Sequence, residues 1–273
     1  MSKTNYGHPY FETVSDQPGL NRLKHNTCGI IDFSLLVLKA GESHTFNTAG
    51  REYGLVIMSG GPVSIHVGEH AFNDLQGRAS VFADKPTMVY AGCNSEVRIQ
   101  AGGDVEIALC SALSSTPIDP YLVLPADVPT GQWGEGNTKR RYRYMINQDR
   151  PSERLWLAEV FVQNGAWATY PPHKHEDVEG DLFQEEMYFY RVDPPHGFGF
   201  CGQFEGLVEE DYAFLIRNNT IHKMPFGNHT VTAAPGYRVL YLAVYAGHDK
   251  GHRPTAHPDH VNFQDNQLSE DDE

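Results

Sequence analysis

Residues 170–191 read YPPHKHEDVEGDLFQEEMYFYR and carry the most informative pattern in the chain. Side chains alternate between the two faces of a β-strand, so His173 and His175 should point the same way, roughly 7 Å apart along the backbone. Two imidazoles in this arrangement can both reach one cation at the ~2.0–2.1 Å bond lengths of a zinc–nitrogen site. The two prolines before them cannot donate to a β-ladder, which suits a strand that begins at the metal. The stretch therefore predicts a metal site built on β-structure.

A second strand-like run follows at residues 186–191, and on it Glu186, Tyr188 and Tyr190 share one face. A carboxylate followed by two phenols is typical of a polar interior that holds a ligand. His229, which ends the Pro/Gly turn at 225–229, offers a fourth ligand. Three imidazoles and one carboxylate leave coordination positions open for water or substrate, as in a catalytic site.

The other histidines weaken this hypothesis only a little. The chain has 14 His, so a His-x-His pair can arise by chance, but its combination with a Glu and a turn-borne His favours metal binding. His222 competes for the fourth position, although its context favours a surface or packing role. Four further histidines lie among Asp, Lys, Pro and Gly and are expected to be solvated in loops: His248, His252, His257 and His260.

The rest of the chain consists of short strand-like runs rich in Val, Ile and Tyr, which recur about every ten residues, as in all-β sandwiches or barrels. No window shows a clean helical period with a cap, so helices should be few. In the first half the runs cover 33–38, 53–58, 62–67, 79–82, 87–90, 96–100 and 105–110, and in the second half 141–146, 155–163, 186–191, 197–203, 213–216, 231–234 and 238–245.

Residues 114–137 interrupt this series with four prolines and a Gly-rich stretch. We interpret them as the connection between two β domains. The two similar halves suggest a duplicated fold, with a first domain over residues 1–125 and a second over residues 126–273. The second ends in an acidic tail at 266–273 that should be solvated.

Composition excludes several classes of protein. The chain has 273 residues, of which 40% are hydrophobic, enough to bury a core and to exclude disorder for most of its length. No apolar run approaches the ~20 residues of a membrane span, and residues 1–10 do not resemble a signal peptide. A net charge of −14 argues against a nucleic-acid partner. The four cysteines are far apart, which predicts reduced, buried thiols in a cytoplasmic protein: Cys28, Cys93, Cys110 and Cys201.

The order H-x-H, Glu, His on short strands resembles the cupin superfamily, whose small jelly-roll barrels use these four residues on a divalent metal. Ten residues separate His175 from Glu186, more than is usual in cupins, and the P-x-G-x-H turn is one residue short. Both departures match a narrower family. The motifs P-P-H-K-H, E-E-x-Y-x-Y-R and P-x-G-x-H-x-V-x-A-A-P-G-Y, with Y-L-x-V-x-A-G after them, resemble the 5-deoxy-glucuronate isomerases of inositol degradation. They lie at 171–175, 185–191, 225–237 and 241–247.

The first half resembles the same family less specifically, and the resemblance covers roughly residues 20–262. It implies an all-β bicupin, with two cupin (double-stranded β-helix, jelly-roll) barrels in tandem and no metal in the first. The residues agree, because His44, His66 and His70 form no H-x-H pair.

The resemblance implies a metal-dependent aldose–ketose isomerase that converts 5-deoxy-D-glucuronate to 2-deoxy-5-keto-D-gluconate through an enediol. The metal ligands would be His173, His175, Glu186 and His229. A general base must move a proton between neighbouring carbons, and the candidates are Tyr188, Tyr190, Glu185 and Glu176. Strand parity favours the tyrosines and turns Glu185 away from Glu186. The substrate carboxylate needs a cation, for which Arg191, Arg143 and Lys174 are available. The basic run 139–143 is interpreted as a strand edge or a domain contact.

The cofactor is expected to be one divalent metal, Zn²⁺ with Mn²⁺ or Fe²⁺ as alternatives, because ligand type alone does not select among them. The expected partners are a small sugar acid and a second copy of the chain in a homodimer, with no nucleic acid and no membrane. Two other functions stay open. An Fe(II)-dependent cupin dioxygenase would consume oxygen, and a non-catalytic sugar-binding cupin would hold no metal.

Overall fold

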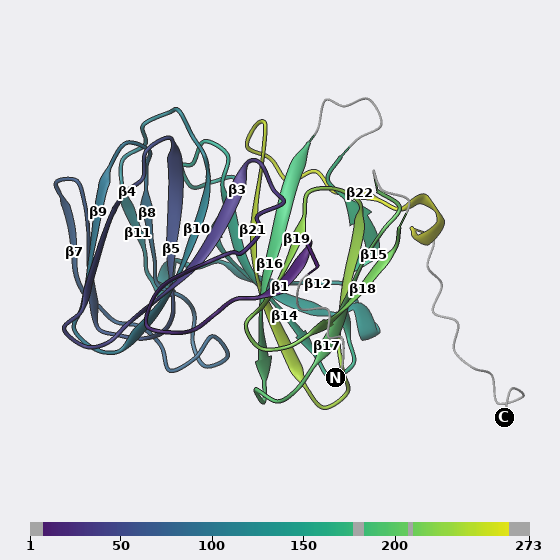
Figure 1. Ribbon diagram of the computed structural model, residues 1–273. Coiled ribbons are helices and arrows are strands. Elements are labelled where there is room, and N and C mark those ends of the chain that lie inside the picture. The colour runs from purple at the N-terminus through teal and green to yellow at the C-terminus, as the bar shows by residue number, and fades with distance from the viewer. Residues whose placement is uncertain (1–7, 177–182, 207–209, 262–273) are drawn as a thin grey trace, which may run out of the picture.

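The computed structural model describes residues 8–176, 183–206 and 210–261, which form two β-barrels lying side by side (Figure 1). Within these residues the only helical segments are three 3-10 turns: Pro125–Asp127, Gly136–Thr138 and Pro258–His260. None of the helices in this part of the chain is long or apolar enough to cross a bilayer. The predicted all-β fold with few helices is confirmed.

The first barrel is made of a six-stranded sheet, in the order β11-β8-β5-β10-β3-β2, packed on a four-stranded sheet, in the order β4-β9-β6-β7. The larger sheet contains β2 (Gly19–Arg22), β3 (Ile31–Leu38), β5 (Arg51–Gly60), β8 (Met88–Ala91), β10 (Val105–Leu113) and β11 (Tyr121–Val123). The smaller sheet contains β4 (Ser43–Asn47), β6 (Val63–Val67), β7 (His70–Leu75) and β9 (Glu96–Ala101).

The second barrel repeats this plan with a seven-stranded sheet, β1-β19-β16-β21-β14-β13-β12, and a five-stranded sheet, β18-β17-β20-β15-β22. The larger sheet contains β1 (Phe11–Thr13), β12 (Thr130–Trp133), β13 (Arg140–Ile146), β14 (Trp156–Gln163), β16 (Gln184–Asp193), β19 (Thr220–Met224) and β21 (Arg238–Gly247). The smaller sheet contains β15 (Trp167–Lys174), β17 (Gly199–Phe204), β18 (Tyr212–Ile216), β20 (Asn228–Ala233) and β22 (Thr255–Ala256).

The order β8-β5-β10-β3 in the first barrel therefore matches β19-β16-β21-β14 in the second, as expected for a duplicated fold. The predicted strand at 79–82 is wrong, because these residues form a turn. The strands that were not predicted are β1, β2, β4, β7, β11, β12, β19 and β22. Most side chains of β4 and β7 are exposed, which gives these two strands a weak apolar pattern.

The segment between the halves contributes one strand to each barrel, β11 to the first and β12 to the second. The proposed boundary between residues 125 and 126 falls between these strands and is kept as a proposal. One strand crosses it: β1, from the start of the chain, pairs with β19 of the second barrel, as Figure 1 shows. The fully buried Lys223 ammonium fastens β1 by an ion pair with Glu12, at 2.6 Å.

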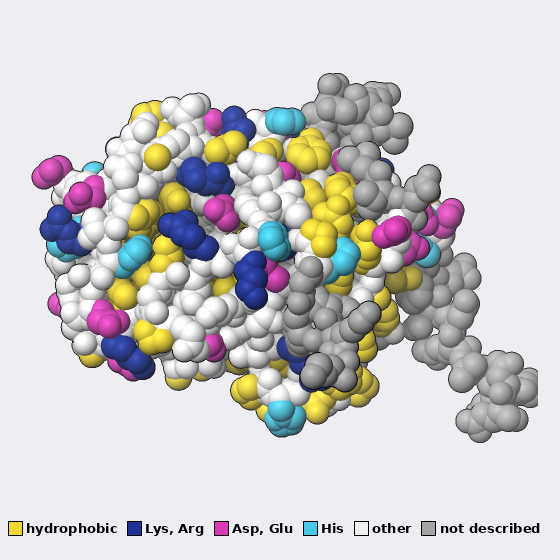
Figure 2. Space-filling model, in the orientation of Figure 1, with side chains coloured by type: hydrophobic (Ala, Val, Ile, Leu, Met, Phe, Trp, Pro, Cys, Tyr) yellow, Lys and Arg dark blue, Asp and Glu magenta, His cyan; other side chains and the backbone are white. Residues whose placement is uncertain are grey.

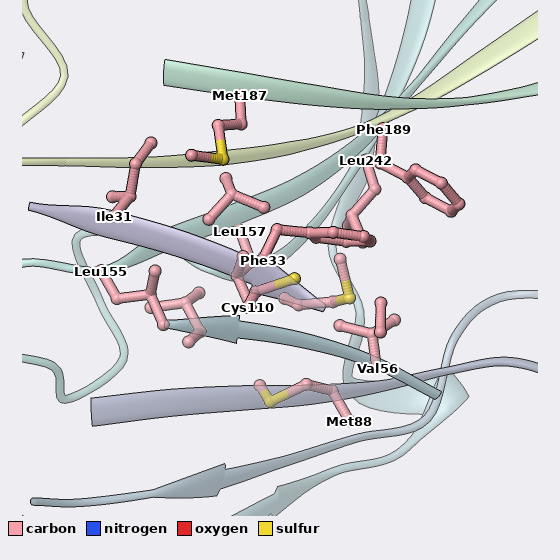
Figure 3. Packing of buried hydrophobic residues seen from close by; sticks show 14 of the residues in the cluster. Ile31, Phe33, Val56, Met88, Cys110, Leu155, Leu157, Met187, Phe189 and Leu242 are labelled. Carbon is pink, nitrogen blue, oxygen red and sulfur yellow. The ribbon is translucent and has the colours of Figure 1, made fainter. Parts of the chain in front are cut away.

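The larger sheets of the two barrels pack face to face through an apolar core (Figure 3). Phe33 and Val56 of the first barrel meet Leu157, Phe189 and others of the second, and the Phe33 and Phe189 rings lie 4.7 Å apart. The sheets approach so closely at Gly54 that a Cβ there would lie 2.1 Å from Leu157. Burial of this face stabilises the barrels as one unit.

Two buried carboxylates reinforce the interface in a reciprocal way. Glu185 of the second barrel accepts hydrogen bonds from the backbone N–H groups of residues 29–31 of the first barrel, at 2.6–3.2 Å. Glu52 of the first barrel accepts hydrogen bonds from the N–H groups of residues 153–155, which lead into the second barrel, at 2.7–2.8 Å. Glu52 and Glu185 are equivalent in the two ladders, because Glu52 faces Ala112 of β10 and Glu185 faces Ala246 of β21.

Candidate metal centre

Four potential metal ligands converge inside the second barrel. His173 is on β15 and His175 just after it, Glu186 is near the start of β16, and His229 is on β20. One ligand atom from each of the four side chains lies within 4.8 Å of the other three. His173 and His229 are directly paired across the β15–β20 ladder, which brings two imidazoles together without a long side chain.

The strand that carries the His pair is irregular where it enters the site. The ladder between β15 and β20 shifts register between Ala168 and His173, a segment that contains Pro171 and Pro172, which have no N–H to donate. Thr169 has φ 52°, a left-handed conformation that costs a β-branched residue energy. The expected strand start at the prolines is wrong, since β15 begins at Trp167. The irregularity instead re-aims the strand just before the histidines.

Two of the four groups, His173 and Glu186, are in charge states that suit metal binding. Burial, with help from the neighbouring His229 and His175, lowers the pKa of His173 well below its usual value, so this imidazole is neutral at pH 7. Burial alone would raise the pKa of Glu186, but the charge and hydrogen bonds of His175 and His229 hold it well below its usual range. A neutral imidazole and an ionised carboxylate are the ligand forms that a divalent cation requires.

The geometry also fits a cation. Nε2 of His175 and Nε2 of His229 both lie 3.0 Å from the same Glu186 oxygen, so the two rings point inward. Neighbouring ligands of a tetrahedral zinc ion stand about 3.4 Å apart, given bonds of about 2.1 Å, so the separations within the set must close by at most about 1.4 Å. The Nδ1 atoms of His175 and His229 are buried and have no hydrogen-bond partner among the described residues. A site with these three imidazoles and one carboxylate can hold a divalent metal.

A pocket of about 360 Å³ opens onto two of these ligands, His173 and Glu186, which is within the usual size range of small-molecule sites. Its wall is largely apolar and includes seven Trp and Tyr side chains. The remaining lining residues are Trp133, Gly134, Arg140, Tyr144, Trp156, Leu157, Ala158, Val160, Thr169, Tyr170, Pro171, Tyr188, Tyr241, Ala243, Tyr245, His252, Pro254 and Ala256.

The expected catalytic tyrosines differ in their access to this pocket. Tyr188 lines it, and its hydroxyl lies 3.3 Å from Nε2 of His229. Burial and the nearby Glu186 raise the pKa of Tyr188 well above its usual value, so the group is a neutral phenol at pH 7. Tyr190 is fully buried and is not part of the pocket wall, and burial raises its pKa as well. The ring of Tyr241 stacks on Tyr188, with centroids 4.1 Å apart.

The structure gives Glu185 a different place from the catalytic one expected. It lies on the opposite face of β16 from Glu186, and its carboxylate accepts hydrogen bonds from backbone N–H groups of the first barrel. Glu176 accepts a hydrogen bond from the Gly227 N–H and lies outside the pocket wall.

The cations expected to bind substrate also lie elsewhere. Arg191 forms an ion pair with Glu106 of the first barrel, at 2.6 Å. Arg143 binds Glu159 at 3.3 Å and lies over the Phe161 ring. Lys174 is partly exposed beside Glu176, at 3.8 Å. Both arginines were expected to bind the substrate because of their charge, whereas in the structure both contribute to contacts between the barrels.

Two residues of the pocket wall were missed. Arg140, expected only as part of a strand edge or domain contact, lines the pocket, and so does His252, expected to be solvated in a loop. Burial, with help from the neighbouring His175, lowers the pKa of His252 to about 4, so its imidazole is neutral. His257 is likewise buried and binds Glu205 at 2.5 Å. His222 has the packing role that its context favoured, fully buried with Nε2 at 3.0 Å from Gln203.

The chain is similar to known proteins over most of its length. A model described as the KduI/IolB family matches residues 18–263. A protein of Geobacillus thermodenitrificans named 5-deoxy-glucuronate isomerase is 29% identical over 242 residues, 88% of both chains. A protein of Shouchella clausii with the same name is 31% identical over 221 residues, 80% of this chain and 81% of the relative.

Solved structures show the same architecture. An IolB-like protein from Salmonella typhimurium LT2 superposes with a TM-score of 0.85 at 28% identity, covering 92% of this chain and 98% of the other. Lactobacillus farciminis oxalate decarboxylase, in a formate complex, superposes with a TM-score of 0.67 at 12% identity, covering 93% of this chain and 94% of the other. At this low identity the second likeness concerns the fold alone.

Proposed function

The chain belongs to the KduI/IolB family, and from this premise we propose that it converts 5-deoxy-D-glucuronate to 2-deoxy-5-keto-D-gluconate in inositol degradation. It is an intramolecular oxidoreductase of the aldose–ketose isomerase type. The observation that carries the proposal is the convergence of three imidazoles and a carboxylate within 4.8 Å, at a pocket of sugar-binding size. An isomerase of this type moves a proton between neighbouring carbons and needs a group that stabilises the charge developed on the oxygens.

His173, His175, Glu186 and His229 would hold the metal. When bound, a divalent cation supplies Lewis-acid polarisation of the substrate oxygens without redox chemistry. We propose Zn²⁺, because a set of three imidazoles and one carboxylate suits it, with Mn²⁺ and Fe²⁺ as the alternatives. Metal content measured on protein purified without chelator tests this choice.

Tyr188 is the proposed hydrogen-bond donor of the wall. Its phenol is neutral and buried, and it lies 3.3 Å from the metal-ligand His229, so it borders the point where the oxygens of C1 and C2 would be held. A neutral phenol can donate a hydrogen bond to an oxygen that gains negative charge, and this bond strengthens as the charge develops. Tyr241, stacked on Tyr188, fixes its ring and so limits its motion. The aromatic wall restricts water around the reacting carbons.

The direct test is incubation of the protein with 5-deoxy-glucuronate, with and without added Zn²⁺ or Mn²⁺, with the product identified by NMR. Glucuronate is the matched control, since it differs by one hydroxyl at C5. The expected result is the 5-keto product from the deoxy substrate in a metal-dependent reaction. No product with either added metal would refute the assignment, and oxygen consumption in the same assay would point to the dioxygenase.

Two further expectations are kept as proposals. The four cysteines are free and buried, as predicted, which suits the reducing cytoplasm as the site of this metabolic step. A homodimer is proposed because sheet edges of this fold commonly pair. Light scattering on the purified protein measures its mass, and a monomer over the micromolar range would contradict the dimer.

A further inference from the structure

The pocket that leads to the metal centre contains one cation among the described residues. Glu186 and Arg140 are the only Asp, Glu, Lys or Arg residues among those that line it. Glu186 belongs to the metal ligands. Arg140 lies on β13, paired with Trp133 of β12, which also lines the pocket.

The guanidinium of Arg140 lacks the partners that other arginines of this region have. Arg143 and Arg191 each form an ion pair with a glutamate, whereas no carboxylate within the described residues lies in ion-pair distance of Arg140. Its Nη1 donates one long hydrogen bond to the Thr138 carbonyl, at 3.3 Å. Its Nε is buried and has no hydrogen-bond partner there. A buried, unpaired N–H on a charged group is costly unless a ligand satisfies it.

Strand parity explains why Arg140 faces the pocket and Arg143 does not. Alternate residues of β13 share a face, so Arg140 lies on the same side as Tyr144, which also lines the pocket. Arg143 lies on the other side and reaches the first barrel, where it binds the Val81 and Asp84 carbonyls. The Cζ atom of Arg140 lies 5.5 Å from the centre of the Trp133 ring, a contact that holds the guanidinium over the pocket wall.

The overall charge of the protein makes this cation necessary for an anionic substrate. The chain carries a net charge of −14, so its long-range field repels a sugar acid. Figure 2 shows that on the face in view Lys and Arg side chains are interspersed with Asp and Glu. A local guanidinium inside an apolar wall is therefore the feature that can favour a carboxylate, and its planar fork matches both carboxylate oxygens.

We propose that Arg140 binds the substrate carboxylate through its unpaired N–H groups and thereby orients the sugar chain with C1 and C2 at the metal ligands. This inference rests on the proposed isomerase function. It makes Arg140 the residue that selects uronates over neutral sugars, in place of Arg143, Arg191 and Lys174.

The test compares Arg140→Gln, Arg140→Lys and the control Arg141→Gln, whose arginine is exposed on the opposite face of the same strand. Each metal-loaded protein is assayed with 5-deoxy-glucuronate and with 5-deoxy-glucose, in which CH₂OH replaces the carboxylate. Arg140→Gln should lower kcat/KM for the acid by about 10- to 100-fold, the range of a charged hydrogen bond, and change it for the neutral sugar by less than about threefold. Arg140→Lys should fall between Arg140→Gln and wild type, and Arg141→Gln should match wild type.

A binding measurement separates this inference from the proposed function. The alcohol obtained by reducing C1 of 5-deoxy-glucuronate keeps the carboxylate and cannot isomerise, so its affinity by calorimetry does not depend on turnover. Weaker binding to Arg140→Gln alone supports the carboxylate site even if wild type shows no isomerase activity. Equal losses for acid and neutral sugar, or unchanged binding of the alcohol, would overturn the inference, with metal content and melting temperature showing that the variant is folded.

Discussion

The two barrels share one strand order but have opposite interiors. The interior of the first is filled with apolar side chains, among them Leu55, Ile57, Ile65, Val97 and Ile99, all fully buried. The interior of the second combines an apolar half with the four candidate metal ligands and the tyrosines beside them. The fold therefore does not depend on the site, because the same ladders form around either interior.

The ladders identify what the first barrel has in place of the ligands. Val97 pairs with Phe46 and Val67, just as His229 pairs with His173 and Gln203. Val97 thus stands where His229 stands, and Phe46 stands where His173 stands.

Tyr53 takes the place of Glu186, because it faces Ala91 and Ser111 as Glu186 faces Met224 and Tyr245. The rings of Phe46 and Tyr53 lie 5.1 Å apart. An aromatic pair thus takes the place of two candidate metal ligands, His173 and Glu186, and the interior of the first barrel is packed with apolar side chains. Chemistry and stability should accordingly be separable by mutation.

The largest effect is expected from the ligands of the second barrel. His175→Ala should lose the metal and lower kcat/KM by at least about 10³-fold, because Lewis-acid stabilisation is worth several kcal/mol. The melting temperature of the apo protein should change by less than about 5 °C, since the barrel core does not include this side chain. Metal analysis, turnover and calorimetry measure the three quantities. An active, metal-free variant would break the comparison.

The matched change in the first barrel is Ile99→Ala. Ile99 is fully buried in the apolar interior, so its truncation leaves a cavity and should lower the free energy of unfolding by about 2–5 kcal/mol. The kcat per folded molecule and the metal content should stay at wild-type levels. Denaturant titration and metal analysis check both parts. A loss of metal in folded Ile99→Ala protein would show that the barrels do not act separately.

The reciprocal carboxylates sharpen the comparison further, because they are equivalent in the two ladders. Glu185→Gln and Glu52→Gln should each lower the free energy of unfolding by about 2 kcal/mol, the range of hydrogen bonds to a charged acceptor. Neither should change kcat by more than about threefold. Equilibrium unfolding and steady-state kinetics measure these outcomes. A selective loss of kcat in Glu185→Gln would restore the catalytic role first expected for it.

The smallest effect concerns Glu153, next to the Glu52 contact. Hydrogen bonds from the Thr116 N–H, the Ser114 hydroxyl and the Ser115 N–H lower its pKa to about 2 against the opposing effect of burial. A depressed carboxyl pKa stabilises the fold above the unfolded value near 4.5, and this stability is lost as the pH falls from about 4.5 to about 2. Glu153→Gln should remove about 1 kcal/mol of this acid dependence after solvent screening is allowed for. The free energy of unfolding of Glu153→Gln is measured at pH 3 and pH 7. If it differs between the two pH values as much as that of wild type, Glu153 is not the source of this acid dependence.

Much of the fold and the centre of the site could be predicted from the sequence, because their signals are local. Alternating Val, Ile and Tyr marked most strands, and the His-x-His pair, Glu186 and His229 each lie on or next to a strand that aims them inward. Strands such as β4 and β7 were missed because most of their side chains are exposed and their sequences are therefore mixed in polarity.

The pocket wall could not be predicted in the same way, because it is assembled from distant segments. Arg140 of β13, Trp156 of β14 and His252, which follows β21, come together only in the folded protein. Charge alone suggested Arg143 and Arg191, which bind glutamates at the interface. Strand parity could have excluded Arg191 from the site. Arg191 and Glu185 both lie on the opposite face of their strand from Glu186.

The pairing of β1 with β19 has a consequence for how the protein is made. Glu12 and Lys223, which fasten this pair, lie 211 positions apart in the chain. At synthesis rates of about 5–20 residues per second, β1 leaves the ribosome roughly 10–40 s before its partner exists. The first barrel can fold during this interval, whereas the edge of the second stays open until the early strand returns to it. Nascent chains stalled before β19 should therefore carry an N-terminal segment that proteases still cut.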